Sequence, residues 1–202
     1  MNNAGRGLLG AVEEATDAAA RAVYDTDVFG TLNVLRAVLP TLRAQRSGRI
    51  VNISSIGGFV GSPRWGVYNS TKFATEGFSE ARAREVAPLG IAVTLVEPGY
   101  FRTDFLDAPS LHTEATTIED YAGTAGAMRR TATDVNHAQP GGPMKAAGAI
   151  VRIASSGQPP PPVQLGRDSF DASAHKIEHV AAEQRTWEDL SVSTDHDDAA
   201  AA

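Results

Sequence analysis

The chain of 202 residues contains no cysteine. This absence excludes disulfide frameworks, thiolate metal sites and a cysteine nucleophile. No apolar run is long enough to span a bilayer. The N-terminal stretch MNNAGRGLLG lacks the basic start and the sustained apolar segment of a secretory signal. We therefore expect a cytoplasmic protein without a membrane partner.

Positive charge is scarce as well. The 18 Lys and Arg residues are outnumbered by 24 Asp and Glu residues, and the formal net charge is −6. The last sixteen residues hold five acidic residues and no Lys or Arg, which leaves the body of the chain close to neutral. Because no basic stripe is available to neutralise phosphates, we expect no nucleic-acid partner.

A metal site is not expected either. His175 and His179 are four residues apart and could share one helix face, but no third ligand stands at a metal-binding spacing. The segment around them is polar throughout, which is typical of a solvated helix.

What the sequence does contain is an alternation of helical segments and buried strands. The run GRIVNISS at 48–55 and the run at 91–99 are short, apolar and rich in β-branched residues, and each is closed by Gly or Pro-Gly. Helical patterns are predicted over about 11–46, with Pro40 expected to kink or divide it, and over about 66–87 and 143–155. This alternation predicts an α/β fold with a Rossmann-like, doubly wound parallel sheet.

The chain is long enough for one domain. We place it at residues 1–168, with an irregular segment at about 104–140 that includes one helix around 118–131, and a short strand near 163–166. The first residues are expected to be the end of a further strand. Residues 169–202 are expected to form a polar helix, to about residue 187, and a disordered acidic tail.

Tyr68 and Lys72 are the first candidate catalytic residues. At a spacing of i and i+4 they share a helix face. A phenol has a pKa of about 10 and is a poor acid or base at neutral pH unless a neighbouring cation stabilises the phenolate. Lys72 can be that cation. The pattern Y-x-x-x-K is short and common, so a coincidental pair is the alternative reading.

The context of the pair favours a site. Ser54 and Ser55 end the strand run at 48–55, and Pro98-Gly99 and Thr103 follow the next strand. Open α/β sheets bind their ligands at the carboxyl ends of the strands. We therefore expect Ser55 to reach the same crevice as Tyr68 and Lys72.

Four ordered motifs resemble those of the short-chain dehydrogenase/reductase family: NNAG (2–5), GRIVNISS (48–55), YNSTK (68–72) and EPGYFRT (97–103). The resemblance covers residues 1–106 closely and 141–166 loosely. The stretch between them falls where the family has its variable substrate loop.

The resemblance implies an NAD(P)-dependent oxidoreductase that interconverts a small-molecule carbonyl and an alcohol by hydride transfer. Tyr68 would be the acid/base, Ser55 would orient the carbonyl oxygen, and Lys72 would lower the pKa of Tyr68 and hold the nicotinamide ribose. The cofactor would also contact Asn2, Asn3, Ala4, Gly5, Pro98, Gly99 and Thr103. Homo-oligomerisation through the helices at about 11–46 and 66–87 is implied too.

One departure from the family pattern concerns Asp27. It stands where the family has an asparagine that kinks a helix and holds a proton-relay water. A carboxylate here would stabilise the charged Lys72 and would oppose a phenolate at Tyr68, so we expect Asp27 to slow the relay without abolishing it. The alternative is a surface Asp that caps a turn.

The second departure is larger. In the family a glycine-rich pyrophosphate turn precedes the NNAG motif, which begins here at residue 2; by the size of βαβ units, on the order of 80 residues would be missing. Gly5, Gly7 and Gly10 spell G-x-G-x-x-G, but no strand precedes them, so they are not expected to be that turn. The chain is therefore expected to be the C-terminal part of the fold, either a piece of a full enzyme or a degenerate relative.

Several functional questions stay open at this stage. The cofactor can be NAD or NADP, with an incomplete binding site, and the activity of the truncated chain is undetermined. The alternative function is a non-catalytic, family-derived interaction protein that pairs with a complete subunit; a hydrolase using Ser55 lacks the G-x-S-x-G elbow. Five aromatic residues either line an apolar substrate pocket or belong to the core: Phe59, Trp65, Phe101, Phe105 and Tyr121.

Overall fold

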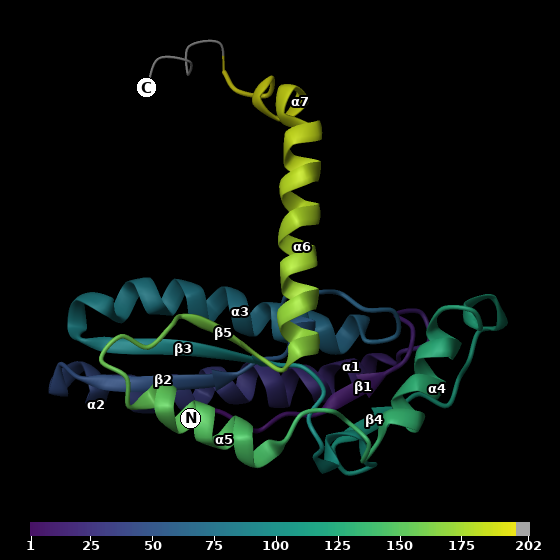
Figure 1. Cartoon of the computed structure of the whole chain (residues 1–202), viewed down its shortest axis with the longest axis horizontal. Helices are drawn as coiled ribbons and strands as arrows, with labels where there is room; N and C mark the ends of the chain where they lie inside the picture. Colours follow the sequence, from purple (N-terminus) through teal and green to yellow (C-terminus); the bar gives the residue numbers. More distant parts are fainter. Residues whose placement is uncertain (197–202) are drawn as a thin grey trace.

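The computed structural model describes residues 1–196, apart from the side chains of residues 129, 130 and 133. Three parallel strands form the main sheet in the order β2 (Gly48–Ile53), β3 (Ile91–Pro98) and β5 (Pro162–Leu165). Asn2 adds an isolated parallel bridge to Asn52 on the outer side of β2. The parallel α/β architecture is as predicted, and residue 2 pairs with the sheet as the end of a further strand would (Figure 1).

The first helical region is shorter than predicted and is divided at a different place. It consists of α1 (Asp17–Tyr24), a π-helical segment (Asp25–Gly30) and α2 (Thr31–Gln45). The start at residue 17 instead of 11 reflects the cap, because the Thr16 side chain accepts a hydrogen bond from the Ala19 N–H. Pro40 lies inside α2 and does not divide it. The interruption is the π-helical segment.

Helices cover both sides of the sheet, which is the doubly wound arrangement. Figure 1 shows α3 (Gly66–Val86) along one side of the strands and α5 (Pro143–Ala154) along the other. One core cluster joins α2 and α3 to β2 and β3; its buried members are Leu35, Ile50, Val86, Ile91 and Val93. Burying each such aliphatic side chain contributes about 1.5–3 kcal/mol. The strands that carry the candidate site are therefore held by packing at their amino-terminal halves.

A second, two-stranded sheet was not predicted. β1 (Gly7–Leu9) pairs in parallel with β4 (Leu111–Thr113). Gly7 suits this close packing, since a Cβ at this position would lie 2.8 Å from Leu111 Cδ1. The G-x-G-x-x-G pattern thus runs through a strand that packs closely against its neighbours, and it does not form the strand-to-helix turn of a dinucleotide fingerprint.

The segment 104–140 is tied to the turn that precedes α1. It contains the 3-10 turns Asp104–Leu106 and Glu119–Tyr121 and the helix α4 (Ala125–Val135), which begins later than the predicted 118. Glu114 accepts a hydrogen bond of 3.0 Å from the Thr16 N–H, and Glu14 accepts one of 2.9 Å from the Ile118 N–H. Two buried carboxylates therefore anchor this segment to the body.

The chain continues from the sheet into a helix that stands away from the body (Figure 1). This helix, α6 (Arg167–Thr186), matches the predicted polar helix, and the short α7 (Glu188–Val192) follows it in the stretch predicted to be disordered. The rest of the predicted tail, residues 197–202, lies outside the described residues. None of the helices within residues 1–196 is long and apolar enough to cross a membrane.

Candidate active site

A cavity of about 860 Å³ lies at the carboxyl ends of β2 and β3. Strand ends, the start of α3 and one face of α5 contribute to its wall. Nearly all of the candidate residues line it: Asn3, Ala4, Gly5, Ser55, Tyr68, Lys72, Pro98, Gly99 and Thr103. Asn2 and Asp27 are not among the lining residues. Segments far apart in the sequence therefore meet in one cavity.

Ser55 is placed by the end of β2. The Ser54 N–H still donates to the Val96 carbonyl at 2.8 Å, and the chain then leaves the sheet. Ser55 has an extended backbone, and its Oγ accepts a hydrogen bond of 3.0 Å from the Gly57 N–H. This cap starts the 3-10 turn Ile56–Gly58 and holds the Ser55 hydroxyl at the wall of the cavity.

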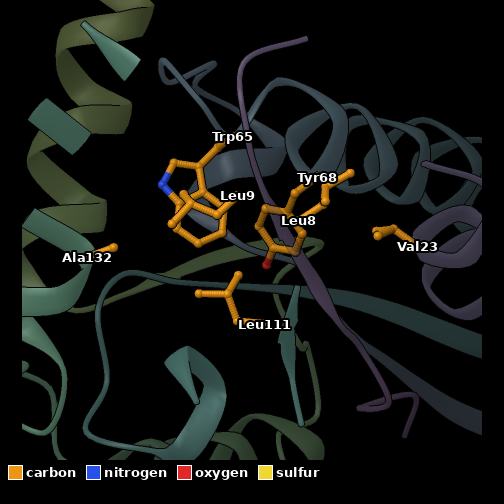
Figure 2. Close-up of a cluster of buried hydrophobic side chains, with 7 residues drawn as sticks. All are labelled: Leu8, Leu9, Val23, Trp65, Tyr68, Leu111 and Ala132. Carbon is orange, nitrogen blue, oxygen red and sulfur yellow. The ribbon is translucent and has the colours of Figure 1, made fainter. Parts of the chain in front are cut away.

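The ring of Tyr68 is packed into an apolar cluster (Figure 2). Trp65 makes an edge-on contact with it at 5.4 Å between centroids, and Phe105 lies at 5.7 Å. The other buried members of the cluster come from four elements: Leu8, Leu9, Val23, Leu111 and Ala132. Because aromatic contacts of this kind fix ring orientation, the hydroxyl of Tyr68 is held in a defined position.

Burial is also the main influence on the acidity of Tyr68. Desolvation raises its pKa above the ordinary value of 10.0, and the carboxylate of Asp27 raises it further. The Lys72 ammonium and a hydrogen bond with Ser55 act in the opposite direction and lower the pKa. The net result is a raised pKa, so Tyr68 holds its proton at neutral pH.

Lys72 and Asp27 form a buried ion pair next to this tyrosine. Nζ of Lys72 lies 3.5 Å from Asp27 Oδ2, donates to the Ile53 carbonyl at 3.4 Å, and lies 5.5 Å from the Tyr68 ring centroid. Oδ1 of Asp27 accepts a hydrogen bond of 2.9 Å from the Arg6 N–H. Asp27 is 2% exposed, which excludes the surface turn cap considered above.

The π-helical segment explains how Asp27 reaches Lys72. It widens one turn between α1 and α2, and the Thr31 hydroxyl donates to the Asp27 carbonyl at 2.9 Å. Segments of this kind are frequent at functional sites, where an extra residue in the turn re-aims a side chain. At the position where the family pattern has a helix kink, this chain has a π turn.

Asp168 is a site-supporting residue that the sequence did not reveal. Its Oδ2 accepts a hydrogen bond of 2.7 Å from the Tyr100 N–H, and its carboxylate lies so close to Gly99 that any Cβ there would overlap it. Gly166, with φ of 96°, turns the chain into α6 and brings Asp168 to this position. No linear motif signals this contact, because 68 residues separate its partners.

Glu76 is a second residue that was missed. It lies on α3 behind the site, and a Cβ at Gly58 would meet both the Ser54 Oγ and the Glu76 Oε1, at 2.6 and 3.1 Å. Burial raises the pKa of Glu76 to about 7; the Ser54 hydroxyl and Lys72 offset part of this shift, while Glu97 and Glu80 add to it. A carboxyl that titrates near neutrality thus lies one layer behind the cavity wall.

The remaining candidates occupy supporting or peripheral places. The Asn2 side chain donates to Asn52 Oδ1 at 2.7 Å, and Asn52 donates to Ser79 Oγ at 2.8 Å, which ties the N-terminal residues to the sheet. The Thr103 hydroxyl accepts from the Phe105 N–H at 3.4 Å. Of the five aromatic residues, Trp65, Phe101 and Phe105 line the cavity, and Phe59 and Tyr121 do not.

Within the described residues one grouping has metal-ligand chemistry. Side-chain atoms of Asp104, Asp107 and His137 lie within 4.8 Å of one another at the surface. Asp107 Oδ1 also accepts a hydrogen bond of 2.7 Å from Asn136 and lies 3.3 Å from His137. The carboxylate of Asp107 therefore already contacts Asn136 and His137.

Comparison with known proteins agrees with this architecture. Residues 1–113 match the family model of the short chain dehydrogenases. A 3-ketodihydrosphingosine reductase from Bacteroides thetaiotaomicron is 41% identical over 168 residues, which is 82% of this chain and 61% of that protein. This chain thus spans about three fifths of the length of that relative.

Solved structures also resemble this chain. A short-chain dehydrogenase from Streptomyces avermitilis superimposes with a TM-score of 0.89 at 39% identity, covering 96% of this chain and 70% of that one. A gluconate 5-dehydrogenase from Burkholderia cenocepacia, in complex with NADP and tartrate, matches with a TM-score of 0.51 at 28% identity over 53% of this chain and 42% of that one. The chain belongs to the short-chain dehydrogenase family.

Proposed function

We propose that this chain contributes the catalytic half of an oxidoreductase site that interconverts a carbonyl and an alcohol with a nicotinamide cofactor. The observation that carries the proposal is the meeting of Ser55, Tyr68 and Lys72 at one cavity wall. Each of the three residue types has a separate task in carbonyl reduction, and chance would not place all three together at the carboxyl edge of a sheet.

The role of Tyr68 follows from its protonation state. Because its pKa is raised, the phenol carries a proton that can be donated to a substrate oxygen. The Ser55 hydroxyl, which hydrogen-bonds Tyr68, can bind the same oxygen and hold it near the proton. Lys72 lowers the pKa of Tyr68 and so stabilises the phenolate left after donation. Asp27 opposes this effect and would slow the return of the proton.

The residues at the cavity wall fit a nicotinamide cofactor. A Cβ at Gly5 would lie 3.5 Å from Lys72 Nζ, so the absence of a side chain leaves the ammonium open to the hydroxyls of a ribose. Asn3 and Ala4 would line the adenosine-ribose side of the cofactor, and the Pro98-Gly99 turn and Thr103 would meet the carboxamide. When bound, the cofactor supplies the hydride. NAD and NADP are both compatible with these contacts.

The substrate is proposed to be a ketone or alcohol with an apolar body. Aromatic and aliphatic side chains make up much of the cavity wall: Trp65, Phe101, Phe105, Leu106, Ile150 and Val151. Such a wall favours burial of hydrocarbon over sugar-like polyols. The name of the Bacteroides relative, a 3-ketodihydrosphingosine reductase, makes a long-chain ketone a reasonable first test compound.

Homo-oligomerisation through α2 and α3 is part of the proposal. Val34 and Val38 on α2 and Phe73 on α3 are 40–48% exposed, so both helices present large apolar side chains to solvent. Pairing of these helices with those of a second copy would cover them.

The test combines cofactor binding and turnover. NADH and NADPH are titrated into the chain, and long-chain ketones are then reduced with the cofactor that binds. Tyr68→Phe keeps the ring and removes the proton donor, so turnover should fall by about 10²–10⁴-fold while cofactor affinity stays within a few-fold. Lys72→Met should weaken cofactor affinity as well as turnover. Failure of the chain to bind either cofactor would overturn the proposal and would favour the non-catalytic interaction protein.

A further inference from the structure

Ser55 is held by a turn that packs directly against α3. This turn is the 3-10 segment Ile56–Gly58, which follows Ser55, and both of its glycines are buried. A Cβ on the first glycine would lie 2.6 Å from Asn69 Oδ1, and a Cβ on the second would lie 3.1 Å from Glu76 Oε1. The absence of side chains at these two positions lets the backbone of the turn approach α3 closely.

Asn69 and Glu76 support the turn from the helix below it. They are seven residues apart, which places them on one face of α3. Asn69 carries no charge at any pH, and its side-chain amide donates to the Val60 carbonyl at 3.4 Å. Of these two supports, Glu76 is the one that can gain a charge.

The surroundings of Glu76 favour its uncharged form. Oε1 is buried and has no hydrogen bond of regular geometry in the part of the chain that the structure describes, and the same holds for the Ser54 Oγ beside it. Burying an ionised oxygen without donors is costly. The Lys72 ammonium, one turn earlier on α3, contacts Asp27 and the Ile53 carbonyl instead of forming a close ion pair with Glu76.

The charges around Glu76 give the same net direction. Burial is the largest influence and raises the pKa of Glu76 to about 7, and the carboxylates of Glu97 on β3 and Glu80 on α3 raise it as well. The Ser54 hydroxyl is near enough to lower the pKa, as is Lys72. Because burial outweighs these two groups, the packed turn favours the protonated carboxyl.

We propose that Glu76 is a positioning residue: as an uncharged carboxyl it supports the turn that holds Ser55, and its ionisation loosens the turn and displaces Ser55. The Gly57 N–H donates to Ser55 Oγ at 3.0 Å, and the Gly58 N–H donates to the Ser55 carbonyl at 2.9 Å. A turn that lifts off α3 releases both contacts. This role rests on the proposed function, in which Ser55 binds the substrate oxygen.

Amide hydrogen exchange of the turn tests this role without any substrate. The opening constant of the turn is measured at about pH 5 and about pH 7.5 and is corrected for the pH dependence of the exchange chemistry itself. It should rise by about tenfold in the parent, because opening lets Glu76 ionise in water and because the partial exposure of Glu76 reduces the full effect. Three N–H groups that donate within the turn are the reporters: those of Gly58, Phe59 and Val60.

Two variants make the exchange measurement specific. Glu76→Gln keeps the shape of the side chain and cannot ionise, so its opening constant should stay the same at both pH values. Glu85→Gln makes the same chemical change at an exposed residue of α3, paired with Arg82 at 2.8 Å, and should keep the rise seen in the parent. No rise in the parent, or an equal rise in Glu76→Gln, would overturn the proposal.

The pH dependence of turnover is the second readout. Ketone reduction by the parent should fall by up to about tenfold as the pH rises through about 7, whereas Glu76→Gln should keep its rate. Tyr68 does not cause a fall in this range, since its pKa lies above 10.0. A pH-dependent turn in a chain that reduces no ketone would refute the proposed function alone. A turn without pH dependence in an active chain would refute the role of Glu76 alone.

Discussion

Replacing Glu76 by glutamine tests the electrostatics behind the cavity wall. Burial raises the pKa of Glu76 from 4.5 to about 7, and the shift corresponds to about 3 kcal/mol. The side chain is only partly buried, so solvent screening reduces the expected contribution to about 1–2 kcal/mol. Glutamine keeps the shape of the side chain and cannot ionise, so the substitution removes only the cost of ionising the buried carboxyl.

The direction of the effect follows from proton linkage. Between pH 4.5 and about 7 the folded chain keeps a proton on Glu76 that the unfolded chain releases. The free energy of unfolding therefore falls as the pH rises through this window. Above about pH 7 the folded chain bears the full cost of an ionised Glu76. Relative to the parent, Glu76→Gln should be more stable by about 1–2 kcal/mol at about pH 8 and should lose this advantage toward about pH 4.5.

Urea denaturation followed by circular dichroism, at the two ends of this window, measures the difference. Glu80→Gln is the matched control, because Glu80 lies one turn further along α3 in an exposed pair with Arg84 at 2.6 Å and should show no comparable pH-dependent gain. Equal pH dependence of stability in the parent and in Glu76→Gln would refute the reasoning. It would mean that Glu76 is solvated in the folded state.

Further substitutions probe other parts of the molecule. Because the Asp27 charge raises the pKa of Tyr68, Asp27→Asn should move the rising limb of the pH profile for alcohol oxidation to lower pH; superimposable profiles would contradict this. Gly7→Ala places a Cβ 2.8 Å from a buried leucine of β4 and should cost about 1–3 kcal/mol in urea denaturation, whereas Gly77→Ala, with open space around it in α3, should stabilise by up to about 1 kcal/mol. Asp168→Ala removes the acceptor of a 2.7 Å hydrogen bond and should cost about 1–3 kcal/mol, and Asp168→Asn should cost less; equal losses would show that the bond is not what matters.

The strands and helices that carry the site could be predicted from the sequence because each has a strong local signal. β2 and β3 are short, mostly apolar runs rich in β-branched residues and bounded by Gly and Pro, and α3 runs without a proline from Gly66 to its end at Val86. These elements bring Ser55, Tyr68 and Lys72 to one edge of the sheet. The order of the motifs then sufficed to identify the family.

What could not be predicted depends on contacts between distant segments. β1 and β4 have three residues each, too few to show a period, and they exist because they pair with one another. The burial of Asp27 required the π turn, and nothing in the local sequence distinguishes that turn from a regular helix. Asp168 and Glu76 acquire their roles only when α6 and α3 are docked on the sheet.

Because Asp168 contacts Tyr100, the C-terminal region tolerates inserted residues at some positions and not at others. Asp168 is the second residue of α6, so the rotational phase of that helix decides whether its carboxylate reaches the Pro98-Gly99 turn. One residue inserted between Gly166 and Arg167 would rotate the start of α6 by about 100° and would break the contact. An insertion near Trp187 would leave it intact, since the helix ends there. For protein engineering, the far end of α6 is therefore the position at which a fused domain leaves the site undisturbed.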